Sequence, residues 1–297
     1  GCGPGRRWLP RLLWPLLLMC GIVLAGAGSA AAAAGDSPTD VAFAPDGSFA
    51  YVTNSGNGTV SQIATLTGGV VATINLKDEI PERVAISADG SFALVALAHS
   101  NSVARIRVSD NKVVATIPLG ESKPWPSNMG LAISPDSTLA YVISQGKEVV
   151  PVRLNDNTVL SALSLGCDPL ECTPAAVAFS PQGGFAYVAV TGSSNGTSRL
   201  HRVRTSDRTV QSVTTIGDSA SHFVNDLAFS PDGRAFLTYN NSVIDADQTS
   251  VIDPLTGAVS PPLLGWQGRR IAFSPDGTFG HLLDSSAGVV RVVGLSD

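Results

Sequence analysis

Charged side chains recur at one matched position beside a short segment that the chain repeats. The six copies of this segment begin at residues 41, 84, 131, 177, 227 and 271, and the residues just before them are Asp40, Arg83, Gly130, Ala176, Asp226 and Arg270. Glu82, Asn225 and Arg269 precede three of these positions, and His222 lies three residues before Asn225. Guanidinium groups bind carboxylates and phosphates through paired hydrogen bonds. One interpretation is therefore that Arg83, Arg269 and Arg270 clamp an anionic ligand, which Asp226, Asn225 or His222 orients, with Asp40 beside them.

The alternative interpretation of the same set is structural. The charges alternate in sign from one repeat to the next, unlike the single-sign lining of a dedicated Ca²⁺ or phosphate pocket. These side chains would then be solvated strand ends or salt bridges between repeats. We accordingly expect no metal site and no cofactor, and the four His and four Cys also make an all-protein transition-metal cage improbable.

A second row of carboxylates lies at the other end of the repeated segment. Asp46, Asp89, Asp136, Asp232 and Asp276 occupy the same place in a Ser-Pro-Asp-Gly-like turn, and Gln182 replaces the Asp in the fourth copy. Pro presets φ, Asp bonds its own backbone and Gly accepts a positive φ. These aspartates are predicted to form turns, because a turn tolerates Gln more easily than a shared catalytic acid would.

Two further features carry possible chemistry. Trp125, between Pro124 and Pro126, is suited to stacking on a sugar or a peptide, although it could equally seal one end of the fold. Cys167 and Cys172 are expected to form a loop-local disulfide if the chain is exported, and a two-Cys metal site is the weaker alternative. The chain has no Gly-x-Ser-x-Gly elbow, phosphate loop or dinucleotide fingerprint.

The elements that must position these residues repeat with the segment. The copies are spaced 43 to 50 residues apart. Each contains a short apolar strand, the turn, a second strand such as Phe49–Thr53, a third such as Val103–Val108 and a fourth such as Val113–Ile117. A period in the forties with this content predicts an all-β propeller of four-stranded antiparallel blades. Six repeats are visible, and the last lacks a fourth strand.

The repeats resemble a known family. Ala50-Tyr51-Val52-Thr53-Asn54 matches the signature of the YVTN (YncE-like) β-propellers, as does Val113-Val114-Ala115-Thr116-Ile117-Pro118-Leu119-Gly120. The likeness covers about residues 40 to 297, although later copies drift from the signature. It implies a relation to lactonase-type propellers and seven blades in a full-length chain. The start at Gly1 and the incomplete sixth repeat are typical of a fragment, and a six-bladed ring with an open seam is the alternative.

The first 35 residues have the order of a secretory signal. Arg6, Arg7 and Arg11 precede an uncharged run that ends in Ala30–Ala34. We therefore divide the chain into a signal peptide at 1–35 and a propeller at 36–297, with an uncleaved membrane anchor as the alternative. The expected location is periplasmic, extracellular or the cell surface.

Composition limits the partners. The 297 residues carry a formal charge of −5, and removing residues 1–35 takes away three Arg and no acid, which makes it −8. This balance disfavours a nucleic-acid partner. The sequence favours an exported, non-catalytic scaffold that binds an unknown protein or small molecule at its axial face, with membrane contact only through an uncleaved N-terminal segment. The alternative is a lactonase-like hydrolase with its site at the axial mouth.

Overall fold

The repeated turns set the register of the whole chain. In the computed structural model each turn closes with a backbone hydrogen bond from the fourth residue to the first, for example from Gly90 to Ser87 at 2.8 Å. Gly90 and Gly277 have φ of 68° there, a conformation that favours glycine. In the five turns that have an aspartate, it accepts hydrogen bonds from side-chain hydroxyls, such as Ser87 Oγ to Asp89 Oδ1 at 2.6 Å. The prediction of turn-forming aspartates is confirmed by these contacts.

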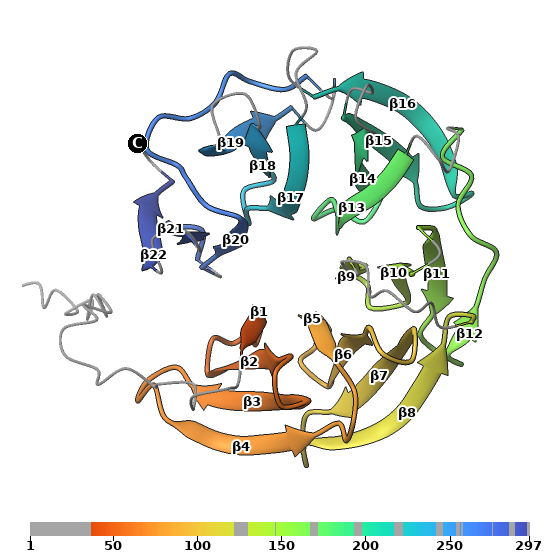
Figure 1. Cartoon of the computed structure of the whole chain (residues 1–297), viewed down its shortest axis with the longest axis vertical. Helices are drawn as coiled ribbons and strands as arrows, with labels where there is room; N and C mark the ends of the chain where they lie inside the picture. The colour runs from red at the N-terminus through yellow and green to blue at the C-terminus, as the bar shows by residue number, and fades with distance from the viewer. Residues whose placement is uncertain are drawn as a thin grey trace, which may run out of the picture.

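The turns connect strands that form six antiparallel sheets arranged as a ring, a β-propeller (Figure 1). The structure describes residues 37–121, 130–145, 147–166, 172–192, 198–216, 222–241, 246–253, 256, 258–274, 276–284 and 289–295. Within these ranges every regular element is a strand, and no helix there has the length and apolar character needed to cross a membrane.

The first three blades have four strands each, in sequence order from the axis outward. Blade 1 contains β1 (Pro38–Phe43), β2 (Phe49–Asn54), β3 (Thr59–Ala64) and β4 (Val70–Asn75). Blade 2 contains β5 (Pro81–Ile86), β6 (Phe92–Leu97), β7 (Ser102–Arg107) and β8 (Lys112–Pro118). Blade 3 contains β9 (Leu131–Ile133), β10 (Leu139–Ile143), β11 (Val149–Arg153) and β12 (Thr158–Val159).

Blade 4 again has four strands, whereas blades 5 and 6 have three each. Blade 4 contains β13 (Cys172–Phe179), β14 (Phe185–Gly192), β15 (Arg199–Arg204) and β16 (Thr209–Thr215). Blade 5 contains β17 (His222–Phe229), β18 (Ala235–Asn241) and β19 (Ala246–Ile252), and its fourth segment adds a single bridge between Ile252 and Val259. Blade 6 contains β20 (Arg270–Phe273), β21 (Phe279–Asp284) and β22 (Val289–Gly294). The predicted fold class is confirmed, including the three-stranded last blade.

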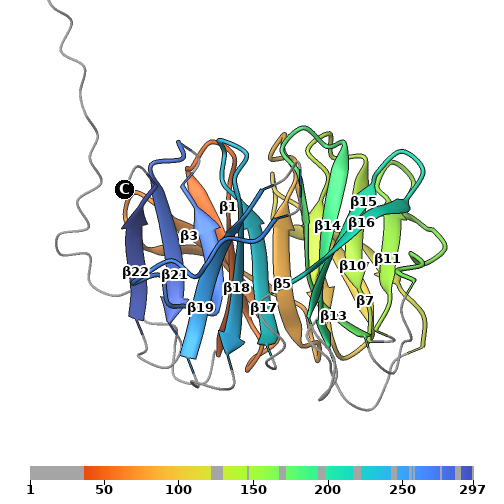
Figure 2. The same cartoon turned by 90° about the horizontal axis from the view of Figure 1, so that it is seen from above.

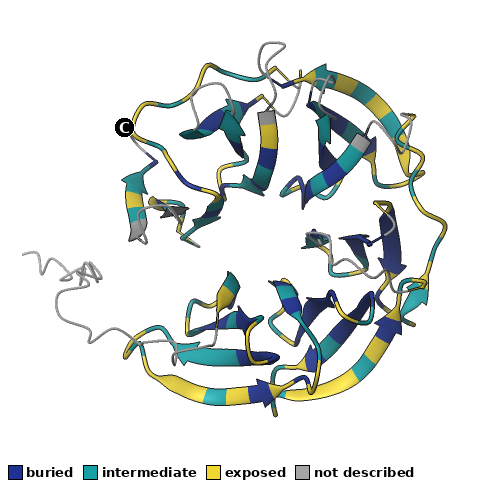
Figure 3. Cartoon of the chain, viewed as in Figure 1, coloured by how far each residue is buried: buried dark blue, intermediate teal, exposed yellow. Residues whose placement is uncertain are grey.

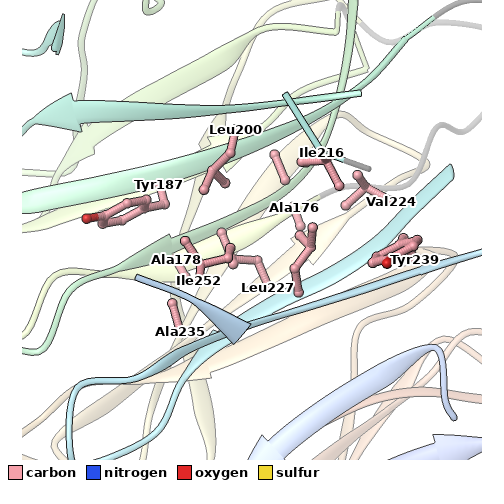
Figure 4. Packing of buried hydrophobic residues seen from close by; sticks show 12 residues of the cluster. Ala176, Ala178, Tyr187, Leu200, Ile216, Val224, Leu227, Ala235, Tyr239 and Ile252 are labelled. Carbon is pink, nitrogen blue, oxygen red and sulfur yellow. The ribbon is translucent and has the colours of Figure 1, made fainter. Parts of the chain in front are cut away.

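The core lies between blades rather than at the centre of the ring. Figure 4 shows the cluster between blades 4 and 5, where Tyr187, Leu200 and Leu227 pack together. The second strands are the most buried, and Tyr51, Tyr141 and Tyr187 are almost fully covered. The outermost strands alternate between exposed and covered residues (Figure 3), because one face of each meets solvent. The scarcity of charge in the sequence follows from this packing of blade against blade.

The seam between the last and first blades differs from the other interfaces. Val41 and Phe43 on β1 are 41% and 37% exposed, whereas the matching Val177 and Phe179 on β13 are each 6% exposed. Phe43 contacts His281 of β21 across the seam with ring centroids 6.4 Å apart. The expectation of a seventh blade in a longer chain stays a prediction.

Candidate functional site at the propeller axis

The innermost strands bring the matched charged positions together inside the ring. β1, β5, β13 and β17 each contain a register shift directly before the matched residue, which is Asp40, Arg83, Ala176 or Asp226. A β-bulge of this kind adds one residue and re-aims the next side chain. In side view (Figure 2) the inner strands run along the axis. Residues at the same register therefore face each other across the axis.

Arg83 joins opposite sides of the ring. Its strand β5 lies across the centre from β17, which carries Asp226 (Figure 1). Arg83 Nη1 lies 3.3 Å from Asp226 Oδ1 and 3.8 Å from Asp40 Oδ1. The Arg83 residue is only 7% exposed, so one guanidinium bridges two largely buried carboxylates. A buried charge needs such partners, because desolvation of an unpaired ion costs several kcal/mol.

The two carboxylates also accept hydrogen bonds from the main chain of the next blade. Asp40 Oδ2 accepts from the Val84 amide at 3.0 Å, and Asp226 Oδ2 accepts from the Ile271 amide at 3.2 Å. Arg270 Nη1 lies 4.0 Å from Asp226 Oδ1, at the limit of an ion pair. Part of the predicted set is thus an inter-blade network, as the structural interpretation of the sequence expects.

Burial dominates the electrostatics of these carboxyl groups. It raises the pKa of Asp226 to about 6, against the lowering effect of Arg83 and with a further increase from the nearby Asp40. Burial also raises the pKa of Asp40, while Arg83 and the amides of Val84 and Val41 lower it. Desolvation disfavours a charged carboxylate, and here it outweighs the attraction of the arginine.

The network borders a cavity of about 130 Å³. Four of the ten lining residues come from blades 3 and 4, where the matched positions hold the small residues Gly130 and Ala176. The complete lining is Asp40, Arg83, Gly130, Leu131, Ala176, Val177, Asp226, Leu227, Ala228 and Ile271. This volume holds several water molecules or one small organic group.

Asn225 and Arg269 both contact Asp247, away from the cavity. Asn225 Nδ2 donates to Asp247 Oδ1 at 3.3 Å, and Arg269 Nε lies 3.5 Å from Asp247 Oδ2. Asp247 belongs to β19, the third strand of blade 5, so this cluster is displaced from the axis. Arg269 does not join Arg83 in the described network. The matched positions found in the sequence all lie beside the innermost strands, so they gave no signal for Asp247 on a third strand.

Several predicted site residues lie outside the described part of the chain. Trp125 and Cys167 are not described, and neither are the side chains of Cys172 and His222. The backbone of His222 starts β17, four residues before Asp226. At roughly 3.3 Å per residue and with one bulge, about 10 Å of strand separates the two. In the described ranges no three His, Cys, Asp or Glu residues gather as a metal site.

Comparison with known proteins supports the fold alone. No protein-family model matches the chain, and no curated protein sequence matches it. Among solved structures, the chain is similar to hydrazine synthase of Kuenenia stuttgartiensis, with a TM-score of 0.74 and 19% identity over 93% of this chain and 81% of that chain. It is also similar to the Cps50 (Swd1) β-propeller domain of Myceliophteria thermophila, with a TM-score of 0.64 and 16% identity over 87% of this chain and 86% of that one. At these identities the likeness establishes a β-propeller and carries no function.

Proposed function

We propose that this chain is an exported propeller of the YVTN type that binds a ligand in its axial cavity and performs no catalysis there. The observation that carries the proposal is the convergence of Asp40, Arg83 and Asp226 from three blades on one polar cavity. Propellers commonly present their axial face to ligands or partners, and their repeated turns and blades serve as a rigid support. Export rests on the signal-like order of residues 1–35.

The lining of the cavity favours binding over chemistry. Its described side chains are two carboxyls, one guanidinium and small or aliphatic groups, with no hydroxyl, thiol, amine or imidazole. Each carboxyl already accepts a main-chain hydrogen bond and lies near Arg83. A catalytic set needs a nucleophile or base free to reach a substrate atom. These carboxyls are instead held by the protein itself.

A matched pair of arginines tests the axial location. A thermal-shift screen of small metabolites on the full chain should yield ligands whose affinity falls at least tenfold in Arg270→Gln, which lies beside Asp226. Arg269→Gln is the control, because Arg269 pairs with Asp247 away from the cavity. Ligands that bind both variants like the wild type would place the binding surface away from the Asp226 and Arg270 side of the axis. N-terminal sequencing of protein recovered from the producing cells tests export separately.

One observation favours the lactonase-like alternative. Burial raises the pKa of Asp226 to about 6, a value suited to acid–base catalysis near neutral pH. This candidate predicts hydrolysis within a panel of lactones that is lost in Asp226→Ala and in His222→Ala. The Arg269→Gln control should retain such activity. Specific loss of this kind would overturn the non-catalytic proposal.

A further inference from the structure

The inner edge of every blade presents one backbone amide to the axis at the same register. In blade 4 the Ser180 amide bonds to the Phe185 carbonyl, so hydrogen-bonded pairs alternate from there along β13. Hydrogen-bonded and non-hydrogen-bonded pairs alternate along an antiparallel strand, and Val177 lies three residues before Ser180. It therefore forms a non-hydrogen-bonded pair with Val188, and its amide points away from β14. In blade 3 the Ser134 amide bonds to the Leu139 carbonyl, and by the same alternation the Leu131 amide points away from β10. The matched residues in the six blades are Val41, Val84, Leu131, Val177, Leu227 and Ile271.

Two aspartates interact with four of these six amides. Asp40 accepts from Val84 in the next blade and interacts with the amide of Val41 in its own blade. Asp226 does the same with Ile271 and Leu227. In each case the next blade also supplies an arginine near the carboxylate. The repeated unit is therefore one carboxylate held by two amides of neighbouring blades, with a guanidinium beside it.

Blades 3 and 4 have the two amides of this unit but not its carboxylate. The position that would serve both Leu131 and Val177 is Gly130, and their other neighbouring positions hold Arg83 and Ala176. Among the described residues, no side-chain acceptor bonds to either amide. Both residues line the cavity, opposite the two aspartates. An amide turned toward a polar cavity is a strong hydrogen-bond donor that calls for an acceptor.

We propose that the carboxylate of a small ligand takes the third position and accepts hydrogen bonds from the amides of Leu131 and Val177. Arg83 is the guanidinium of this third unit. It contacts both aspartates through Nη1. In the described part of the chain its Nε and Nη2 hydrogens are therefore available to a ligand oxygen. Asp40 and Asp226 oppose a more highly charged anion such as phosphate. This inference rests on the proposed axial binding site and names the chemical class of its ligand.

Acetate is the simplest probe. The full chain, labelled with ¹⁵N at Leu, Val and Ile, is titrated with sodium acetate at constant ionic strength and followed by amide resonances. The Leu131 and Val177 resonances should shift and saturate, whereas those of Val84 and Ile271, which already bond to aspartates, should not. Acetamide and sodium chloride should give no saturable shift. Equal shifts at all four amides, no saturation, or saturation by phosphate but not acetate would overturn the inference.

A tethered carboxylate provides a second test. A Cβ at Gly130 would lie 2.5 Å from Ile143 Cδ1 and 3.0 Å from its Cγ1, so Gly130→Asp is combined with Ile143→Ala, which removes both atoms. The new carboxylate should occupy the amides and weaken acetate binding at least tenfold. Gly130→Ala in the same Ile143→Ala background is the matched control and should retain acetate binding. Undiminished binding in the Asp variant would contradict the assignment of the amides.

The two proposals can fail separately. If axial ligands from the metabolite screen bind but acetate does not, the carboxylate assignment alone falls. If acetate binds at Leu131 and Val177 but the chain hydrolyses a lactone and loses that activity in Asp226→Ala, the non-catalytic function falls and the anion subsite remains.

Discussion

Aspartates at the turns and aspartates at the axis occupy opposite electrostatic environments, although the turn position follows the axial position by only six residues. Asp276 in the last turn is exposed, and hydrogen bonds from Ser274, the Thr278 amide and the Thr278 hydroxyl lower its pKa. Asp226 at the axis is buried, and desolvation raises its pKa to about 6. The same side chain is thus stabilised in its charged form at one place and penalised at the other.

The difference separates folding from recognition. The turn position is Asp in five of six copies, because every turn needs the same local acceptor. The axial position holds Asp, Arg, Gly or Ala, so its chemistry varies around the ring while the backbone does not. Uniform positions support the blades, and the position that breaks the repeat forms the cavity.

Removing Arg83 should produce the largest effect. Arg83→Met leaves Asp40 and Asp226 buried without their shared cation, and we expect a loss of about 3 kcal/mol in the free energy of unfolding. Arg107→Met removes an exposed pair with Asp110, which water and salt screen, and should change the free energy of unfolding far less than Arg83→Met does. Urea denaturation at pH 7.5 measures both. Similar small losses in the two variants would show that the axial charges are effectively solvated.

The pH dependence of stability should reveal the two kinds of aspartate with opposite signs. Between about pH 4 and 6, native Asp226 holds a proton that the unfolded chain releases, so its contribution to stability falls as pH rises through this window. The change is on the order of 3 kcal/mol, because each pKa unit corresponds to about 1.4 kcal/mol. Turn aspartates have lowered pKa values, and their contribution is present above about pH 4 and lost as pH falls below it.

Two amide substitutions separate these windows. Asp226→Asn should flatten the stability profile between about pH 4 and 6, and Asp276→Asn should flatten it only below about pH 4. Urea unfolding from pH 2.5 to 8 gives the profiles. A flattened window below pH 4 in Asp226→Asn would contradict the burial of its carboxyl.

The sequence predicted the fold well because its signal was repeated. The strand predicted at Phe49–Thr53 is β2 at Phe49–Asn54, and that predicted at Val113–Ile117 lies within β8. The turn residues act locally, so each copy reports the same geometry independently. The register they impose is also why the spacing of the repeats alone was enough to place Asp40, Arg83 and Asp226 at one matched position of the inner strands.

The rest of the site depends on side-chain partners and amide directions that cannot be predicted from residue types. Arg269 and Arg270 are adjacent in sequence, yet one pairs with Asp247 on a third strand and the other lies near Asp226. The amides of Leu131 and Val177 belong to apolar residues, so only the pairing of the strands shows their direction. In the sequence this part of the site is marked only by the absence of charge, because Gly130 and Ala176 occupy the position that is charged in the other four copies.

The smallest expected effect comes from making the fourth turn like the others. Ser180 Oγ bonds only to the main chain of Phe185, whereas Ser87 and Ser274 also donate to the aspartate two residues later. Gln182→Asp should restore that acceptor and add about 0.5 kcal/mol of stability, seen as a small rise in Tm. Gln182→Glu carries the same charge on a longer side chain that does not fit this turn, and it should give no gain. An equal gain from Glu would mean that charge, rather than the local hydrogen bond, stabilises the turns, and the contrast with the axial aspartates would then be one of exposure alone.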